Sequence, residues 1–246
     1  MTGAPLQWAR KGATAIITLS GRPAGNRIDR AMAQEIYAAA EAIAADDDVA
    51  VVLLCARGPS FSISGDPAGG VEPDWAAALG ALPQPLVAAV QGDAVDEGAE
   101  LALIADLRLC ARNARFRFNH LRGDRLPSHG ATQRLPRAIG RMRAMEVLLS
   151  GRWVGAAEAA RIGLANEVVA PEGLGRRAKL VCRELAAKGP LALRYAKEAI
   201  GAGTDMTFAQ GVRLEQDLYV LLQTTADRAE GVKSFTTQRA PRFRGR

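Results

Sequence analysis

The run VAVVLLC at residues 49–55 is apolar throughout and shows no alternation with polar side chains. A strand with this pattern is covered on both faces, as the strands of a parallel sheet are. Strand-like and helix-like segments alternate along the first half of the chain, which indicates βαβ units and an α/β fold. The expected strands are 13–19, 49–55, 86–90 and 107–111, and the expected helices are 30–45, 75–82 and 98–105.

The second half of the chain has the pattern of a helical region. Apolar residues recur there at spacings of three or four, and glycines stand where helices would end. The expected helices are 141–149, 156–163, 175–188, 191–202 and 208–222. With 246 residues, the chain is long enough for one large α/β domain, or for a core domain with a smaller appended one.

Composition and motif content argue against several classes of function. The net charge of +6 is spread along the chain except in the terminal RAPRFRGR, and only 5% of residues are aromatic, so no nucleic-acid surface is expected. Cys55, Cys110 and Cys182 form no CxxC pair, which disfavours a zinc site and a disulfide framework. P-loop, HExxH and GxSxG motifs are absent. Because we find no membrane-spanning apolar stretch and no secretory signal, we expect a cytoplasmic protein.

Two loops that follow expected strands have the composition of a ligand site. Residues 56–67 and 91–98 both combine glycines with acidic residues. Ligands of open parallel sheets bind beyond the carboxyl ends of the strands. The second loop also opens a helix, whose first N–H groups lack partners within the helix. Such a pair of loops can hold an anionic oxygen between two backbone N–H donors, although glycine-rich loops also serve simply as turns.

Glu100 is the first candidate for chemistry, because it stands among small aliphatic residues in the segment 85–106. A carboxylate in apolar surroundings is costly unless it has partners or a task. The alternative is that Glu100 merely complements the dipole at the start of a helix.

Five segments, in order, resemble the crotonase superfamily, the enoyl-CoA hydratase/isomerase family. They are VVLLCARGPSFSISGD at 51–66, PQPLVAAVQGDAVDEGAELALIAD at 83–106, TQRLP at 132–136, SGRWVGAAEAARIGLANEVV at 150–169, and EGVKSF with the terminal FRGR. The resemblance implies a ClpP/crotonase-like α/β fold of repeated ββα units. It also implies a core domain at 1–185 and a C-terminal helical oligomerisation or lid region at 186–246.

The same resemblance implies roles for individual residues. The backbone N–H groups of Gly65 and Glu97 would hold a thioester oxygen, and Glu100 matches a catalytic carboxylate. Asp96 and Glu97 depart from the family, which usually has small residues there. The segment between Asp66 and Pro83 also looks short, which implies a differently shaped acyl pocket.

A second catalytic carboxylate of the family would fall twelve residues before Thr132, where this chain has His120. Histidine changes charge close to neutral pH, so His120 can act as a general acid/base in its place. The alternative is a packing role. Asp124, Glu97 and His129 are further candidates in the altered loops. For Trp75 and Trp153 we expect packing rather than ligand contact.

By resemblance, the expected function is enoyl-CoA hydration or dehydration, a lyase reaction, through an enolate stabilised by the oxyanion hole. Double-bond isomerisation, C–C bond hydrolysis and non-catalytic binding of acyl-CoA or a partner remain alternatives, with RNA binding as a possible side role of the basic surface. Arg22 and Arg57 are the candidate ligands of the coenzyme A phosphates. We expect no metal and no cofactor apart from the coenzyme A of the thioester substrate. A homotrimer or homohexamer is expected, with neither a membrane nor a nucleic acid as partner.

Overall fold

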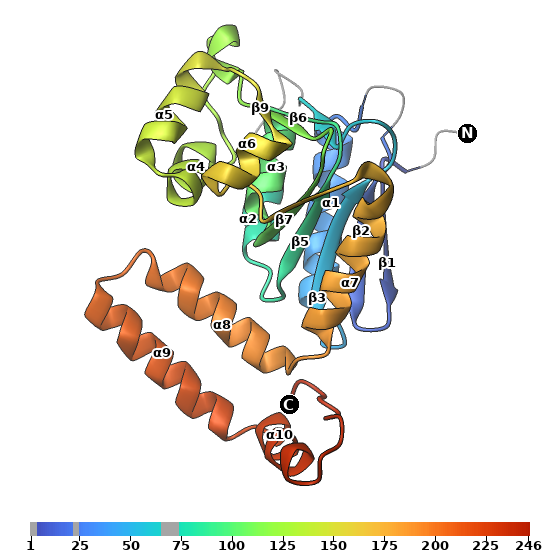
Figure 1. Ribbon diagram of the computed structural model, residues 1–246, viewed down its shortest axis with the longest axis vertical. Coiled ribbons are helices and arrows are strands. Elements are labelled where there is room, and N and C mark those ends of the chain that lie inside the picture. Colours follow the sequence, from blue (N-terminus) through green and yellow to red (C-terminus); the bar gives the residue numbers. More distant parts are fainter. Residues whose placement is uncertain (1–3, 22–24, 65–73) are drawn as a thin grey trace.

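The computed structural model describes residues 4–21, 25–64 and 74–246. Its centre is a six-stranded sheet in the order β1-β2-β3-β5-β7-β10, which is parallel except for the β1–β2 pair (Figure 1). The strands are β1 (Leu6–Lys11), β2 (Thr14–Leu19), β3 (Val51–Ala56), β5 (Leu86–Val90), β7 (Leu107–Ala111) and β10 (Glu167–Val169). The expected strands are all present, to within two residues at each end.

A second, four-stranded sheet has the order β4-β6-β8-β9. Its strands are β4 (Ser62–Ile63), β6 (Asp93–Val95), β8 (Arg115–Arg117) and β9 (Val154–Gly155). Successive strands alternate between the two sheets before each helix, as in β3-β4-α2 and β5-β6-α3, where α2 is Trp75–Gly80 and α3 is Glu97–Ile104. The predicted α/β fold of repeated ββα units is therefore confirmed.

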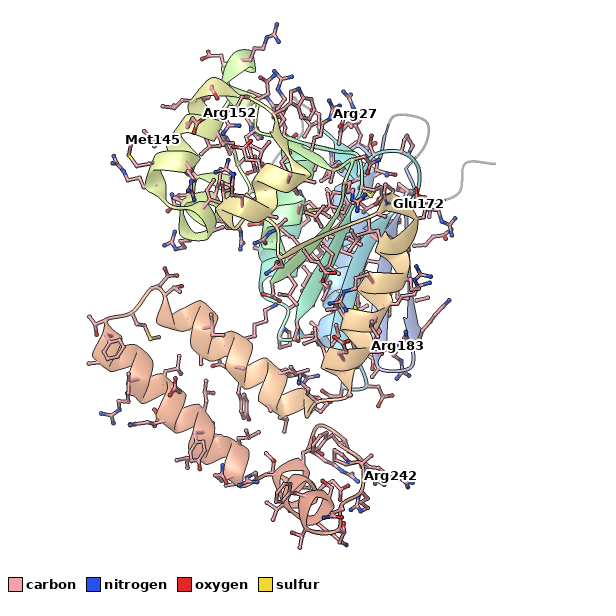
Figure 2. The ribbon with its side chains drawn as sticks, in the orientation of Figure 1. Arg27, Met145, Arg152, Glu172, Arg183 and Arg242 are labelled. Carbon is pink, nitrogen blue, oxygen red and sulfur yellow. The ribbon has the colours of Figure 1, made fainter. Side chains whose placement is uncertain are left out.

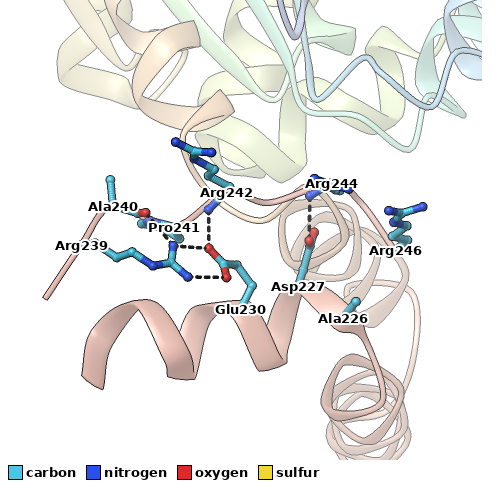
Figure 3. A pocket seen from close by; sticks show the side chains of 9 residues that line it. All are labelled: Ala226, Asp227, Glu230, Arg239, Ala240, Pro241, Arg242, Arg244 and Arg246. Carbon is cyan, nitrogen blue, oxygen red and sulfur yellow. Dashed lines mark hydrogen bonds and ion pairs between the residues drawn. The ribbon is translucent and has the colours of Figure 1, made fainter. Parts of the chain in front are cut away.

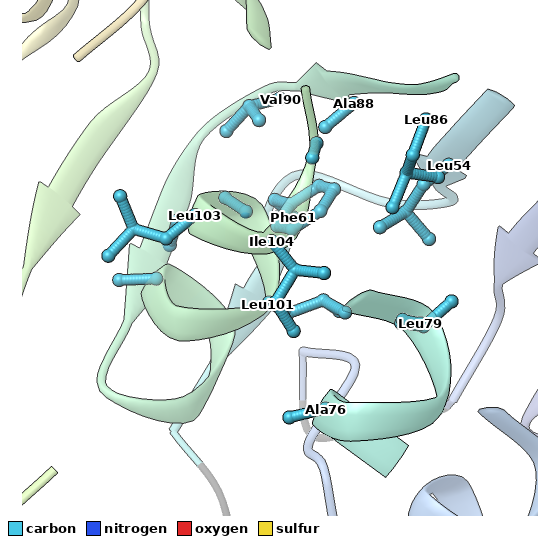
Figure 4. Packing of buried hydrophobic residues seen from close by; sticks show 14 of the residues in the cluster. Leu54, Phe61, Ala76, Leu79, Leu86, Ala88, Val90, Leu101, Leu103 and Ile104 are labelled. Atoms are coloured by element: carbon cyan, nitrogen blue, oxygen red, sulfur yellow. The ribbon is translucent and has the colours of Figure 1, made fainter. Parts of the chain in front are cut away.

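The core lies on both sides of the larger sheet. Residues on one side of β3 and β5, including Leu54 and Leu86, join the cluster beneath α1 (Arg30–Ala44), α2 and α3, and Figure 4 shows these two with Phe61 and Leu101. The intervening residues, such as Leu53, join a second cluster under α7 (Leu174–Ala186), which packs against β3, β5 and β7. Both faces of β3 are covered, which explains why its sequence shows no alternation.

Three further helices and two 3₁₀ turns follow β8 along the chain. The helices are α4 (Ala131–Ile139), α5 (Arg141–Ser150) and α6 (Ala156–Ile162), and the 3₁₀ turns are η1 (His120–Gly123) and η2 (Pro171–Gly173). Turn η1 and helix α4 follow β8. Helix α4 packs against α3, so the chain returns to α3 after it leaves the second sheet.

The C-terminal helices α8 (Pro190–Gly203), α9 (Phe208–Gln223) and α10 (Ala226–Thr236) stand apart from the α/β part (Figure 1). Lys197 of α8 ties them to the core, because its ammonium lies 2.7 Å from the Asp106 carboxylate and donates to the Gln84 carbonyl at 3.0 Å. The expected boundary between 185 and 186 falls in the last turn of α7 and stays a prediction. Within the described ranges, no helix is long and apolar enough to cross a membrane.

Candidate active site

Helix α3 begins where two loops of the chain come into close contact. A Cβ atom added to Gly98 would lie 2.2 Å from the Ser62 carbonyl oxygen, so only glycine permits this approach of α3 to β4. Ser64, the residue after β4, donates its N–H to the Val95 carbonyl at 2.9 Å. The chain leaving β4 therefore runs beside the start of α3, as the two expected ligand loops require.

The Glu100 side chain, in the first turn of α3, has no exposed surface. Its Oε1 accepts hydrogen bonds from the backbone N–H groups of His129 at 2.9 Å and Ala131 at 3.2 Å. Burial by itself would raise the pKa of Glu100, but the nearby His120 and His129 side chains, together with the His129 N–H, outweigh it and lower that pKa to about 2. Glu100 is therefore ionised at neutral pH, and a loop distant in sequence donates hydrogen bonds to it. These contacts show that Glu100 does more than complement the dipole of α3.

His120 lies between two carboxylates. Its Nε2 is 3.4 Å from Glu100 Oε2, and its Nδ1 is 3.5 Å from Asp96 Oδ1. The ring is 1% exposed, and neither nitrogen makes a well-formed hydrogen bond within the part of the chain that the structure describes. Catalytic hydrogen bonds are often long before substrate binds, so these distances fit an acid/base group as well as a packed ring.

His129 approaches Glu100 from the other side. Its Nδ1 lies 3.4 Å from Glu100 Oε2 and 3.1 Å from the Ser128 hydroxyl. The ring stacks on buried Trp75, with 4.5 Å between the ring centroids. Trp75 therefore packs a loop of the site against α2, in agreement with the expected packing role.

Arg125 compensates part of the negative charge around the start of α3. Its guanidinium lies 2.8 Å from the Glu97 carboxylate and 3.8 Å from that of Asp96. The Glu97 side chain is 7% exposed, so the pair sits at the edge of the buried cluster. The bulky residues that replace small ones at 96 and 97 are thus accommodated by a cation from the loop after η1.

An apolar hollow of about 400 Å³ lies beside His120. Its walls include residues of η1, α4 and α5, among them Met145 of α5, which Figure 2 labels. A hollow of this size and lining is suited to an apolar group. The apolar lining residues are Phe118, Leu121, Leu126, Pro127, Pro136, Ala144, Met145, Leu148 and Leu149.

A larger hollow of about 760 Å³ lies between α10 and the C-terminal tail, away from this cluster (Figure 3). Glu230 binds Arg239 through two contacts of 2.6 and 2.8 Å, and Asp227 accepts the backbone N–H of Arg244 at 2.7 Å. Its acidic groups are thus already used to hold the tail, and none of the catalytic candidates lines it.

Known proteins resemble this chain along almost its whole length. A family model described as enoyl-CoA hydratase/isomerase matches residues 66–246. A probable enoyl-CoA hydratase of Mycobacterium leprae is 35% identical over 239 residues, covering 93% of each chain. The chain belongs to the enoyl-CoA hydratase/isomerase family.

Two further relatives agree with this assignment. The 2,3-dehydroadipyl-CoA hydratase of Escherichia coli is 31% identical, covering 97% of this chain and 98% of its own. The crystal structure of an enoyl-CoA hydratase from Bacillus anthracis is 30% identical, with a TM-score of 0.93, covering 98% of this chain and all of its own. The predicted family, crotonase fold and enzyme class are confirmed.

The structure brings some of the predicted site residues together but not others. Glu97, Glu100 and His120 come together at the start of α3. Asp124 is exposed at the end of η1, and its carboxylate makes no hydrogen bond within the described ranges, so the structure does not bring it to Glu100. Gly65 and Arg22 lie outside the described residues.

Arg57 lies at the other end of the site region, after β3. It is exposed and lines a hollow of about 310 Å³ together with Gly21, Gly25 and Ser60. This hollow is at the carboxyl ends of β2 and β3, where the sheet presents its loops. A phosphate-binding role for Arg57 is compatible with that place and stays a prediction.

Three contacts of the cluster were not predicted from sequence. These are the Asp96–His120 approach, the Arg125–Glu97 pair and the stacking of His129 on Trp75. The negative charge of Asp96 was the sequence feature that could have indicated the first of these contacts, because a buried acidic residue requires a partner. Trp153, by contrast, lies outside the cluster, with the Arg115 guanidinium 4.4 Å from its ring centroid.

We expect acid to weaken the fold partly through Glu100. Because its folded pKa of about 2 lies below the ordinary 4.5, the ionised carboxylate contributes stability above about pH 4.5 and loses it as the pH falls toward 2. The contribution is on the order of 3 kcal/mol. Thermal unfolding of the wild type and of Glu100→Gln between pH 5 and pH 3 measures it. The wild type should lose stability faster than the variant, and parallel profiles would contradict the assigned environment.

Proposed function

We propose that this chain catalyses the reversible hydration of an enoyl-CoA thioester, with Glu100 and His120 as its acid/base pair. The single observation that carries the proposal is the buried, ionised Glu100 with an imidazole nitrogen 3.4 Å away. A hydratase needs two groups, one that directs water to the β-carbon and one that exchanges a proton with the α-carbon. The names of the relatives support hydration as the reaction.

In the proposed reaction, Glu100 accepts a hydrogen bond from the attacking water, and the water oxygen forms a bond to the β-carbon. The electron pair of the double bond moves to the α-carbon and thioester, and His120 gives a proton to the α-carbon. The proton released by water passes to Glu100 and then to His120. The low pKa of Glu100 favours this last transfer, because the carboxylate does not retain a proton at neutral pH.

The developing charge on the thioester oxygen would be held by the backbone N–H groups of Gly65 and Glu97. Glu97 opens α3, and the start of a helix is suited to binding negative charge. Two such donors aimed at an oxyanion are worth several kcal/mol in a site without water. The apolar hollow beside His120 supports an apolar acyl group as the part of the substrate beyond the reacting carbons.

The assay that tests this proposal follows hydration of crotonyl-CoA by the wild type, Glu100→Gln and His120→Ala. Loss of activity in both variants is the expected result. Equal activity in all three would overturn the assignment of the pair. If the wild type instead moves the double bond of a 3-enoyl-CoA without adding water, the reaction is isomerisation, which needs only one group that shuttles a proton.

Arg57→Ala is expected to raise KM for the thioester about tenfold and to change kcat less than twofold, because an exposed cation would bind the coenzyme A phosphates at a distance from the reacting carbons. Initial rates over a range of substrate concentrations measure both constants. The matched control is Arg183→Ala on α7 (Figure 2), where KM should stay unchanged. An unchanged KM for Arg57→Ala would remove Arg57 from the proposed phosphate site.

We also propose that the chain assembles as a homotrimer or homohexamer in the cytoplasm. Large apolar side chains of the C-terminal helices support the assembly, since Ile200, Phe208 and Phe235 are 72%, 89% and 87% exposed. Such side chains are usually covered by a partner when they form a contiguous surface. Analytical ultracentrifugation would contradict the proposal if it found a monomer at micromolar concentration.

A further inference from the structure

Asp96 has a backbone conformation that side-chain-bearing residues rarely adopt. Its φ is 49° and its ψ is −114°, between the end of β6 and the start of α3. The surrounding chain holds this conformation, because the Asp96 N–H donates to the Arg117 carbonyl at 2.8 Å and its carbonyl accepts from the Glu100 N–H at 2.9 Å. Glycine would take up the same conformation at lower cost. A strained residue of this kind beside a buried cluster points to a role for its side chain.

The Asp96 carboxylate acts on the segment that carries His120. Its Oδ1 accepts the backbone N–H of Asn119 at 2.5 Å and lies 3.5 Å from His120 Nδ1. Asp96 Oδ1 therefore faces both the Asn119 N–H and His120 Nδ1, the ring nitrogen on the side away from Glu100. The carboxylate is 10% exposed, so water competes little for these contacts.

The two nitrogens of His120 thus have different neighbours of the same charge. Nδ1 faces Asp96 and Nε2 faces Glu100. A carboxylate that accepts Nδ1–H fixes the orientation of the ring, so the proton that His120 gives to the substrate is the one on Nε2. Glu97, Arg125 and His129 are the other titratable groups of the cluster, and Arg125 is already bound to Glu97.

We propose that Asp96 is a positioning residue that holds Nδ1–H of His120, so that Nε2 faces Glu100 and the substrate. The catalytic part of this inference rests on the proposed function, because it takes His120 to be an acid/base group. The orientation of the ring does not depend on that function and can be measured without substrate.

The sharpest variant is Asp96→Asn. Asparagine has nearly the shape of aspartate and keeps an oxygen for the Asn119 N–H, so it removes only the negative charge that faces His120 Nδ1. We expect kcat to fall about 100-fold, with KM within threefold of the wild type. The matched control is Asp93→Asn on β6, where the carboxylate binds only Arg115 within the described ranges and kcat should stay within twofold.

A double variant tests whether Asp96 acts through His120. Asp96→Asn with His120→Gln should lose no more activity than His120→Gln alone, because the positioned group is already gone. Additive losses would overturn the positioning role. Full activity of His120→Gln would instead overturn the proposed function, and the ring orientation would then be decided by spectroscopy alone.

The spectroscopic test uses ¹⁵N signals of the imidazole rings at one fixed pH. The chain has two histidines, so His129→Gln assigns both sets of signals. In the wild type we expect the Nδ1 signal of His120 to be that of a protonated nitrogen, and Asp96→Asn should move it while Asp93→Asn does not. An unchanged His120 spectrum in Asp96→Asn would overturn the inference whatever the activity shows.

Discussion

Glu100→Gln is expected to lower kcat for hydration by about 1,000-fold, within the range that a general acid/base group contributes. The amide retains an oxygen for the His129 and Ala131 N–H groups, so the loop that contacts Glu100 should keep its place. It cannot accept a proton from water, and it removes the negative charge that faces His120. Single-turnover measurements with saturating enzyme separate this loss from a change in product release.

The control for this variant is Glu146→Gln on α5, an exposed carboxylate that binds Arg152 at 2.7 Å. Its kcat should stay within twofold of the wild type, because an exposed ion pair contributes little to the fold. A Glu100→Gln enzyme that retains a tenth of its activity or more would contradict the central role given to this carboxylate.

Gly98→Ala is expected to destabilise the fold by about 3 kcal/mol or more. The new Cβ would lie 2.2 Å from the Ser62 carbonyl oxygen and 2.7 Å from Ser62 Cβ, and neither of these atoms can move aside without a shift of the β4 backbone. Helix α3 would have to shift away from β4, so kcat should fall as well. For a chain of this length, the loss corresponds to a decrease of roughly 6–12 °C in Tm, which thermal unfolding followed by circular dichroism measures.

Gly201→Ala on α8 is the matched control. Outside α8's own backbone, no atom of the described residues lies within 4 Å of the Cβ added there, and alanine favours a helix more than glycine does. Its free energy of unfolding should be unchanged or higher by up to about 1 kcal/mol, so its Tm should not fall. If Gly98→Ala behaved like this control, the close contact between α3 and β4 would be absent in solution.

The long elements of the fold could be predicted from the sequence because their patterns report burial directly. Strands β3 and β5 are continuous apolar runs, and both faces of each are covered. The strands of the second sheet are two or three residues long, which is too short for a period of two to show. Helix α4 was not predicted, and Pro136 within it interrupts the helical pattern.

Glu100 could be identified by its charge in an apolar segment, and His120 by its spacing from TQRLP under the family resemblance. Neither signal shows which nitrogen of His120 faces which carboxylate. That arrangement follows from the parallel pairing of β6 with β8, in which Val95 lies opposite Arg117. This register places Asp96, which follows β6, beside Asn119 and His120, which follow β8.

The sequence by itself determined the α/β class, the family and the buried carboxylate, because these depend on local patterns and on residue identity. The tertiary structure alone decided that Asp96, Glu100, His120 and His129 form one cluster. Their separations along the chain reach 33 residues, and no local pattern reports a contact over that distance. The physical reason is that strand register and the close approach at Gly98 set the geometry, and both depend on pairing between distant segments.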